Sequence, residues 1–382
     1  MSIVYSLVPQ TQLDGNPLVA SLLVLVSFLL GLRLCHGVRR LRHVSERVLV
    51  LGGNSLGRQV IEEIERRRDL GHAVVGVVED SENLGRIIEA TRPNRIVVAL
   101  AERRGRLPLY PLLESRARGI LVEDAAETYE RLTGKLALEA LSPSSVIFSP
   151  DFHPSRLHLA LSRALSLVAS VIGLIVLAPV LSLIVLLIKL DSRGPVFFVQ
   201  ERVGLCGRSF KLIKFRSMHP VSRPKSEWER DNCDRITRVG KWLRRFRLDE
   251  LPQLVNVLRG DMNLAGPRPH PQTNLELMIL AVRNLSELSG EAIPYYSLRC
   301  SVRPGITGWA QICYGYANTL EEEMEKIRYD FYYLKHMSFW LDLQILFETV
   351  KIVLSGGGSG DGDAGGPSTR DRRPVTHLGR AA

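Results

Sequence analysis

The chain has 382 residues, of which 45% are hydrophobic, and its formal net charge is +10. This is ample for a packed core in two or three domains, and the positive charge favours an anionic partner: acidic lipid, nucleic acid or a phosphorylated substrate. Two apolar segments are long enough to enter a bilayer, so we expect membrane lipid and no nucleic acid. Five scattered cysteines without CxxC spacing argue against a disulfide framework or a cysteine metal site.

The first apolar segment, residues 17–32, carries no charge and has about the length of a spanning helix. Arginines follow it and none precedes it, which is the reverse of a cleavable signal peptide. By the positive-inside rule the N-terminus lies outside and the chain after the helix starts in the cytoplasm. We therefore predict a transmembrane helix and a basic linker over residues 1–46.

Residues 47–145 predict a Rossmann-like α/β domain. The expected strands are Val48–Leu51, His72–Glu79 and Arg95–Leu100, with a helix from Arg58 to Arg68. A tight turn follows the first strand and is a candidate cofactor-binding turn through Gly52, Gly53 and Gly57. Its dinucleotide signal is weak, because Asn54 replaces the middle glycine of the GxGxxG pattern. A domain that kept the fold without the ligand is the alternative.

The second apolar segment lies in the predicted linker and membrane region, residues 146–190. It is uncharged from Ala164 to Ile188, and Pro179 interrupts it and should kink the helix. Basic residues flank both ends, which favours a re-entrant helix that dips into one leaflet and returns to the cytoplasm. An ordinary second span would instead put the remaining chain outside.

Residues 191–354 are polar and rich in motifs and predict a cytoplasmic α/β domain with interfacial helices, and residues 355–382 predict a disordered tail rich in Gly and Ser. Period-two alternation would put Lys214 and Arg216 on one face of a strand. In Gly266-Pro-Arg-Pro269 the prolines leave Arg268 little freedom, which suits bidentate phosphate recognition, and Arg303 also lies beside a turn. A surface salt bridge is the alternative for each arginine.

The aromatic-rich stretch Tyr329–Leu354 predicts one helix, whose rings suit either a membrane interface or the core.

Adjacent carboxylates, Asp249 and Glu250, follow Arg244 and precede an apolar helical run with Pro252 in its first turn. We expect Asp249 at the helix N-cap, where free N–H groups and the helix dipole attract anions. This stretch has two interpretations. It is either a phosphate site with a reactive carboxylate or a simple helix cap.

Five motifs in this order resemble the bacterial polyprenyl-phosphate glycosyl-1-phosphate transferases of the monotopic superfamily, over roughly residues 157–354. They are Lys214-Phe-Arg-Ser-Met218, Leu248-Asp-Glu-Leu-Pro-Gln-Leu254, Asn256-Val-Leu-Arg-Gly-Asp-Met262, Gly266-Pro-Arg-Pro269 and Arg303-Pro-Gly-Ile-Thr-Gly-Trp-Ala-Gln-Ile312. The α/β domain resembles that of the longer members, which carry several N-terminal spans where this chain has one.

The resemblance implies transfer of a sugar-1-phosphate from a UDP-sugar to undecaprenyl phosphate, with release of UMP, at the bacterial inner membrane. It implies that Asp249 is the nucleophile and that Glu250 holds Mg2+, a hard cation suited to carboxylate and phosphate oxygens. Arg244 and Arg268 match positions that contact phosphate, and Lys214, Arg216 and Arg303 join them as candidates. Pro179 matches the proline that breaks the re-entrant helix.

Two positions depart from the family pattern: Ala178 stands where serine is usual before that proline, and Ser166 where aspartate is usual near the helix start.

Two other functions compete with this one. A membrane-bound NAD-dependent nucleotide-sugar dehydratase or epimerase would carry a Tyr-x-x-x-Lys pair, and none of the ten tyrosines has lysine four residues on. An inactive scaffold of polysaccharide assembly would have lost one of the two adjacent carboxylates. The sugar, homo-oligomer formation and any ligand of the α/β domain stay open.

Overall fold

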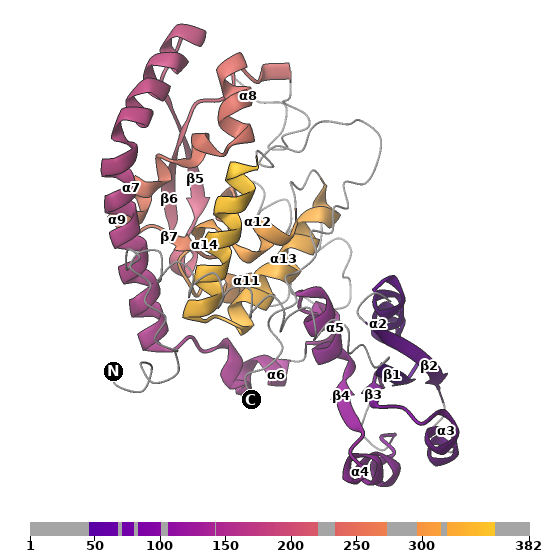
Figure 1. Cartoon of the computed structure of the whole chain (residues 1–382). Coiled ribbons are helices and arrows are strands. Elements are labelled where there is room, and N and C mark those ends of the chain that lie inside the picture. The colour runs from indigo at the N-terminus through magenta and orange to yellow at the C-terminus, as the bar shows by residue number, and fades with distance from the viewer. Residues whose placement is uncertain are drawn as a thin grey trace, which may run out of the picture. The chain divides into compact units, whose positions relative to one another are not determined.

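The structure is a computed structural model that describes residues 46–67, 71–79, 83–100, 106–141, 143–220, 234–272, 296–314 and 319–355. The predicted N-terminal span and the predicted tail beyond residue 355 lie outside these ranges. Contacts within the chain define two compact units that meet between Asp124 and Ala125 (Figure 1).

The first unit is a parallel four-stranded sheet with strand order β2-β1-β3-β4. Its elements are β1 Glu46–Leu51, α2 Ser55–Arg66, β2 His72–Val78, α3 Leu84–Thr91, β3 Arg95–Val98, α4 Leu109–Ala117 and β4 Leu121–Asp124. The central strands β1 and β3 are nearly continuous apolar runs, as a sheet covered on both faces requires, and Leu49, Leu51 and Ile96 are fully buried in its core. The predicted strands and the α/β class are confirmed.

The second unit is a mixed α/β unit built around a hairpin and a small parallel strand pair. Its helices are α5 Ala125–Thr133, α6 Pro143–Phe148, α7 Arg156–Asp191, α8 Arg238–Arg245, α9 Gln253–Arg259, α11 Tyr296–Arg299, α12 Trp309–Cys313, α13 Leu320–Lys335 and α14 Phe339–Leu354. Single 3-10 turns are η2 Leu138–Ala140, η3 Pro150–Phe152, η4 Leu205–Gly207 and η6 Leu248–Glu250. The strands β5 Phe197–Val203 and β6 Ser209–Phe215 pair antiparallel, and β7 Asn263–Ala265 and β8 Gly305–Thr307 pair parallel.

The prediction of one helix over residues 329–354 is wrong, because two helices meet there. α13 ends at Lys335 and α14 starts at Phe339, where the Ser338 hydroxyl accepts a hydrogen bond from the Leu341 N–H at 3.2 Å and caps the new helix. The aromatic residues divide in the same way. Those of α13 are buried in the core, whereas Trp340 at the start of α14 is 78% exposed.

Helix α7 is long and apolar enough to cross a membrane, and no other helix in the described ranges meets that test. Its first half buries a stripe of four residues spaced by one helical turn, His158, Ser162, Ser166 and Ser170, and its second half buries Ile184 and Ile188. Along this face it packs against α8, α9, β7 and α14 of the same unit (Figure 1). Large apolar side chains cover the opposite face and are exposed.

Candidate active site

The two adjacent carboxylates lie in η6, one 3-10 turn that leads into α9. Arg247 precedes the turn in the left-handed backbone conformation, with φ 51°, and α9 has Pro252 at its N-cap without a side-chain cap. The prediction that Asp249 caps this helix is therefore wrong, because Asp249 lies in the 3-10 turn and precedes the N-cap residue, Pro252. The simple cap does not explain this residue.

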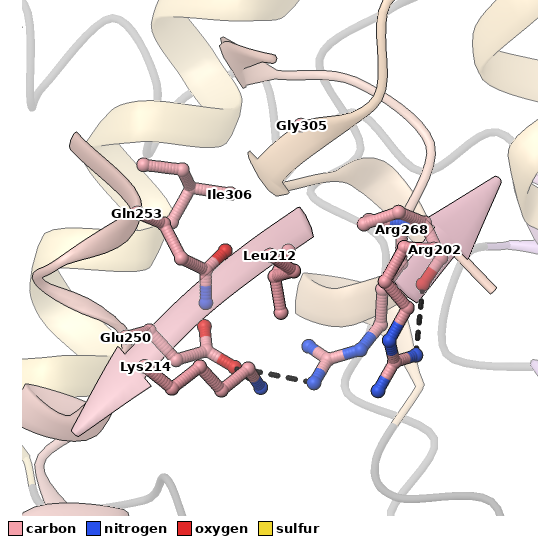
Figure 2. Close-up of a pocket in the computed structure, with 9 residues that line it drawn as sticks. Arg202, Leu212, Lys214, Glu250, Gln253, Arg268, Gly305 and Ile306 are labelled. Atoms are coloured by element: carbon pink, nitrogen blue, oxygen red, sulfur yellow. Dashed lines mark hydrogen bonds and ion pairs between the residues drawn. The ribbon is translucent and has the colours of Figure 1, made fainter. Parts of the chain in front are cut away.

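Glu250 is buried and held by two cations. Its Oε1 atom lies 3.2 Å from Lys214 Nζ on β6 and 3.1 Å from Arg268 Nη2 in the loop after β7. Burial alone would favour the protonated acid, but the neighbouring cations outweigh it and keep the pKa of Glu250 well below its usual range. Glu250 is therefore ionised at all physiological pH values. Figure 2 shows the three side chains converging from separate elements.

Asp249 lies in a different electrostatic environment although it is the next residue. Poor solvation raises the pKa of its carboxyl group to about 6, and the negative charge of Glu250 acts in the same direction. The cations Lys214, Arg244 and Arg247 oppose this rise without cancelling it. Two neighbouring carboxyl groups with pKa values pushed in opposite directions are typical of sites where each has its own chemical role.

Glu250, Lys214 and Arg268 line a small pocket, and Asp249, the residue before Glu250, is not among the lining residues. The walls of this pocket are completed by residues of five segments: Arg202, Leu212, Gln253, Pro269, Gly305 and Ile306. The Gln253 side chain points toward the Glu250 carboxylate in Figure 2. Sequence reasoning missed Arg202 and Gln253 as site residues. Gln253 lies within the motif around the carboxylates and was within reach of that reasoning, whereas no local pattern distinguishes Arg202 on β5.

The remaining predicted cations divide into two groups. Arg244 on α8 lies near the carboxylates: its Nη1 donates to Ser217 Oγ at 3.3 Å and its charge lowers the pKa of Asp249. Arg303 instead donates from Nε to the carbonyl oxygen of Gly260, the residue that ends α9, at 3.0 Å. The structure brings Arg244, but not Arg303, to the carboxylates.

Arg216 also lies away from the pocket. Strand β6 ends at Phe215, so the alternation expected to put Lys214 and Arg216 on one face stops before Arg216. The buried guanidinium donates to the carbonyl oxygens of Arg193, Ile188 and Ser192, at 3.1, 3.3 and 2.7 Å. Arg216 therefore caps the C-terminal end of α7, where unpaired carbonyls favour a cation.

The first half of α7 is anchored by polar contacts to α9, to β7 and to the residue before β7. Ser166 Oγ accepts a hydrogen bond from the Leu264 N–H at 3.1 Å, so serine supplies an acceptor where the family pattern has aspartate. Arg163, one turn earlier, donates to the carbonyl oxygens of Met262 and Val257 at 2.9 and 2.8 Å. Pro179 lies farther along, inside the continuous helix α7, and the kink expected at this residue stays a prediction.

The turn after β1 in the first unit holds the three predicted cofactor glycines. Gly52 has φ +108°, and a Cβ atom there would lie 2.4 Å from the carbonyl oxygen of Ala99. The fold itself thus requires glycine at this position. Asn54 caps α2, since its Oδ1 accepts the Gly57 N–H at 2.7 Å. Nucleotide binding at Gly52, Gly53 and Gly57 stays a prediction.

Residues 157–356 match the family model described as bacterial sugar transferase. The chain belongs to this family. The chain is 40% identical to the UDP-N-acetylgalactosamine-undecaprenyl-phosphate N-acetylgalactosaminephosphotransferase of Aeromonas hydrophila over 60% of its own length and 51% of the relative's. It is 35% identical to the undecaprenyl-phosphate glucose phosphotransferase of Komagataeibacter xylinus over 84% and 61% of the two chains.

A shorter relative is matched over almost its whole length. The exopolysaccharide production protein PSS of Rhizobium leguminosarum bv. phaseoli is 40% identical over 52% of this chain and 98% of its own length. In contrast, the matched region spans only about half to three fifths of the length of the two larger relatives. The family typically needs a divalent metal.

Proposed function

We propose that this protein transfers a sugar-1-phosphate from a UDP-sugar to undecaprenyl phosphate and releases UMP, through a covalent phospho-sugar intermediate on Asp249. The observation that carries the proposal is the pairing of an electrostatically clamped Glu250 with an Asp249 whose pKa is raised to about 6. The names of the relatives, which describe transfer to undecaprenyl phosphate, support the same reaction. They differ in the sugar, so the sugar stays open. One relative's name indicates exopolysaccharide production, and we place this transfer at the start of such a synthesis.

In the first step an oxygen of the Asp249 carboxylate bonds to the sugar-proximal phosphorus of the UDP-sugar. The bond from that phosphorus to the bridging oxygen breaks, and UMP leaves with the electron pair. Lys214, Arg244 and Arg268 present positive charge that offsets the repulsion between carboxylate and diphosphate. Because Asp249 titrates near 6, it is mostly ionised and nucleophilic at neutral pH.

In the second step a phosphate oxygen of undecaprenyl phosphate attacks the same phosphorus, and Asp249 departs as a free carboxylate. The lipid acceptor requires the site to work at a membrane surface, and the exposed apolar face of α7 suits this. Division into two displacements also explains why one pocket can serve a soluble nucleotide and a lipid in turn.

Glu250 fits a magnesium site of the kind completed by substrate phosphates. Mg2+ is usually held by one or two protein carboxylates, with waters and phosphate oxygens as further ligands. No group of three or more potential metal-ligating side chains occurs in the described part of the chain, whereas one ionised, buried carboxylate is present in the pocket. Both ion pairs of Glu250 use Oε1, so Oε2 is the oxygen we assign to the ion. When bound, Mg2+ would neutralise charge on the diphosphate.

We further propose that α7 is re-entrant and that the catalytic unit faces the cytoplasm at the bacterial inner membrane. A helix of 36 residues is about 54 Å long, and a plain span puts its two ends on opposite sides of an apolar layer about 30 Å thick. Here Ser166 near one end contacts β7, and Ile188 near the other packs with Phe215 and Leu243 of the same unit. Both halves of α7 therefore contact the same folded unit. This supports a helix whose two ends lie on the same side of the membrane.

The reaction is tested with purified full-length protein, Mg2+, undecaprenyl phosphate and a panel of UDP-sugars, with UMP release as the readout. Release with at least one sugar, and its loss in Asp249→Asn, is the expected result. Arg118→Ala, at the exposed residue that directly follows α4, is the control. Wild-type protein that releases no UMP with any sugar contradicts the activity, and turnover by Asp249→Asn contradicts the nucleophile.

The topology is tested separately by labelling Arg156→Cys and Arg193→Cys in a background lacking the five native cysteines. Both exposed positions flank α7. Labelling from the same side of sealed vesicles is expected, and labelling from opposite sides would mean a true span.

A further inference from the structure

The loop that carries Arg268 is held in part through its backbone carbonyl oxygens. Pro267, Pro269 and Pro271 lack an N–H, so these positions cannot donate hydrogen bonds to neighbouring elements. Four consecutive carbonyls instead each accept a hydrogen bond from another segment. The donors to residues 267, 268, 269 and 270 are Gly305 N, Arg299 Nη2, Arg202 Nη1 and Val203 N.

Among these donors, Arg299 contacts Arg268 directly, because its side chain donates a hydrogen bond to the Arg268 carbonyl oxygen. Its guanidinium is buried and forks between Arg268 and Asp330: Nη2 donates to the Arg268 carbonyl oxygen, and Nε lies 2.7 Å from Asp330 Oδ2 on α13. The third nitrogen, Nη1, lies 3.4 Å from the Tyr296 hydroxyl oxygen. The side chains of Arg299 and Asp330 are 4% and 3% exposed. A buried charge of this kind persists only where a partner neutralises it, and Asp330 supplies that partner.

From the loop the chain of contacts continues to the carboxylates, because Arg268 Nη2 lies 3.1 Å from Glu250 Oε1. We propose that Arg299 and Asp330 are positioning residues that fix the direction of the Arg268 side chain toward Glu250 and the donor diphosphate. Neither reaches the pocket walls, so they act through Arg268. This inference rests on the proposed function, and it adds two residues outside the motifs that carry the family resemblance.

The chemistry of the fork favours arginine. A planar guanidinium can donate in two directions at once, whereas a lysine ammonium on a single stem reaches one of these acceptors and leaves the other unsatisfied. Arg299→Lys therefore keeps the buried charge and releases the Arg268 carbonyl or Asp330. A misplacement of about 1 Å at such a site lowers the rate about 100-fold.

A double-mutant cycle separates positioning from general stability. UMP release by full-length protein is measured for wild type, Arg299→Lys, Arg268→Ala and the double variant. We expect Arg299→Lys to lower kcat about 100-fold alone and less than about 3-fold in the Arg268→Ala background, because residues that act through a shared partner are non-additive. Arg328→Lys is the matched control, an Arg-to-Lys change on α13 whose side chain pairs with Glu325 at 3.1 Å.

Equal losses in both backgrounds would overturn the positioning role and leave the proposed function intact. Absence of UMP release from wild-type protein would instead count against the proposed function. If Arg299→Lys lowers the Tm by more than the control does, Asp330→Asn takes its place in the same cycle, since it keeps the side-chain shape and removes the charge that orients Arg299. Additive losses there would overturn the proposal equally.

Discussion

The opposite electrostatic settings of Asp249 and Glu250 predict how the pH dependence of the first step responds to mutation. With a pKa of about 6, Asp249 is ionised in about one tenth of molecules at pH 5 and in about nine tenths at pH 7. The rate of UMP release should therefore rise about 10-fold over this range and then level off. Measuring a single turnover without undecaprenyl phosphate keeps the acceptor's own titration out of the profile.

Two substitutions should move this rising limb in opposite directions. Lys214→Met removes a positive charge that favours the ionised form of Asp249, so the pKa of Asp249 and the limb move to higher pH. Glu250→Gln removes a negative charge that disfavours it, so the limb moves to lower pH even though the plateau falls. A limb that stays in place in both variants, or moves the same way in both, would refute the assignment of this titration to Asp249.

Three further predictions concern the supporting structure. Arg216→Ala should lower the free energy of unfolding by about 3 kcal/mol, because three carbonyls at the end of α7 lose a charged donor. Urea unfolding measures this loss. A large rise in KM for the UDP-sugar without a loss of stability would argue instead for a role in phosphate binding. Gly52→Ala should destabilise the first unit by at least about 2 kcal/mol, because the new Cβ atom would lie 2.4 Å from the backbone carbonyl oxygen of Ala99. An unchanged denaturant unfolding curve would contradict this steric argument. Asp249→Asn should stabilise the protein above pH 6 and not below pH 4. The folded state of the wild type binds the Asp249 proton more tightly than the unfolded state, so its stability falls as pH rises between these values; a Tm difference independent of pH would contradict this.

The sequence could predict the reactive pair and most of its surroundings because those features are local. The parallel sheet follows from short apolar runs separated by helical segments, and the apolar helix from its length. The residue types of the motifs already indicate phosphate chemistry, and these motifs contain Lys214, Asp249, Glu250 and Arg268. Helix boundaries that depend on a single capping residue are harder to predict. At Ser338 the sequence pattern therefore predicted one helix where the structure has two.

The destination of each long basic side chain, in contrast, was decided by tertiary structure. Lys214 and Arg216 are two residues apart in one motif, yet one reaches Glu250 and the other the end of α7, because the strand stops between them. Arg299 reaches the Arg268 loop only because α11, α13 and that loop pack together. The sequence by itself determined which charges the protein carries near its carboxylates. Only the folded chain decided which carbonyl or carboxylate each would meet, since a flexible side chain of several rotatable bonds takes its direction from its neighbours in space.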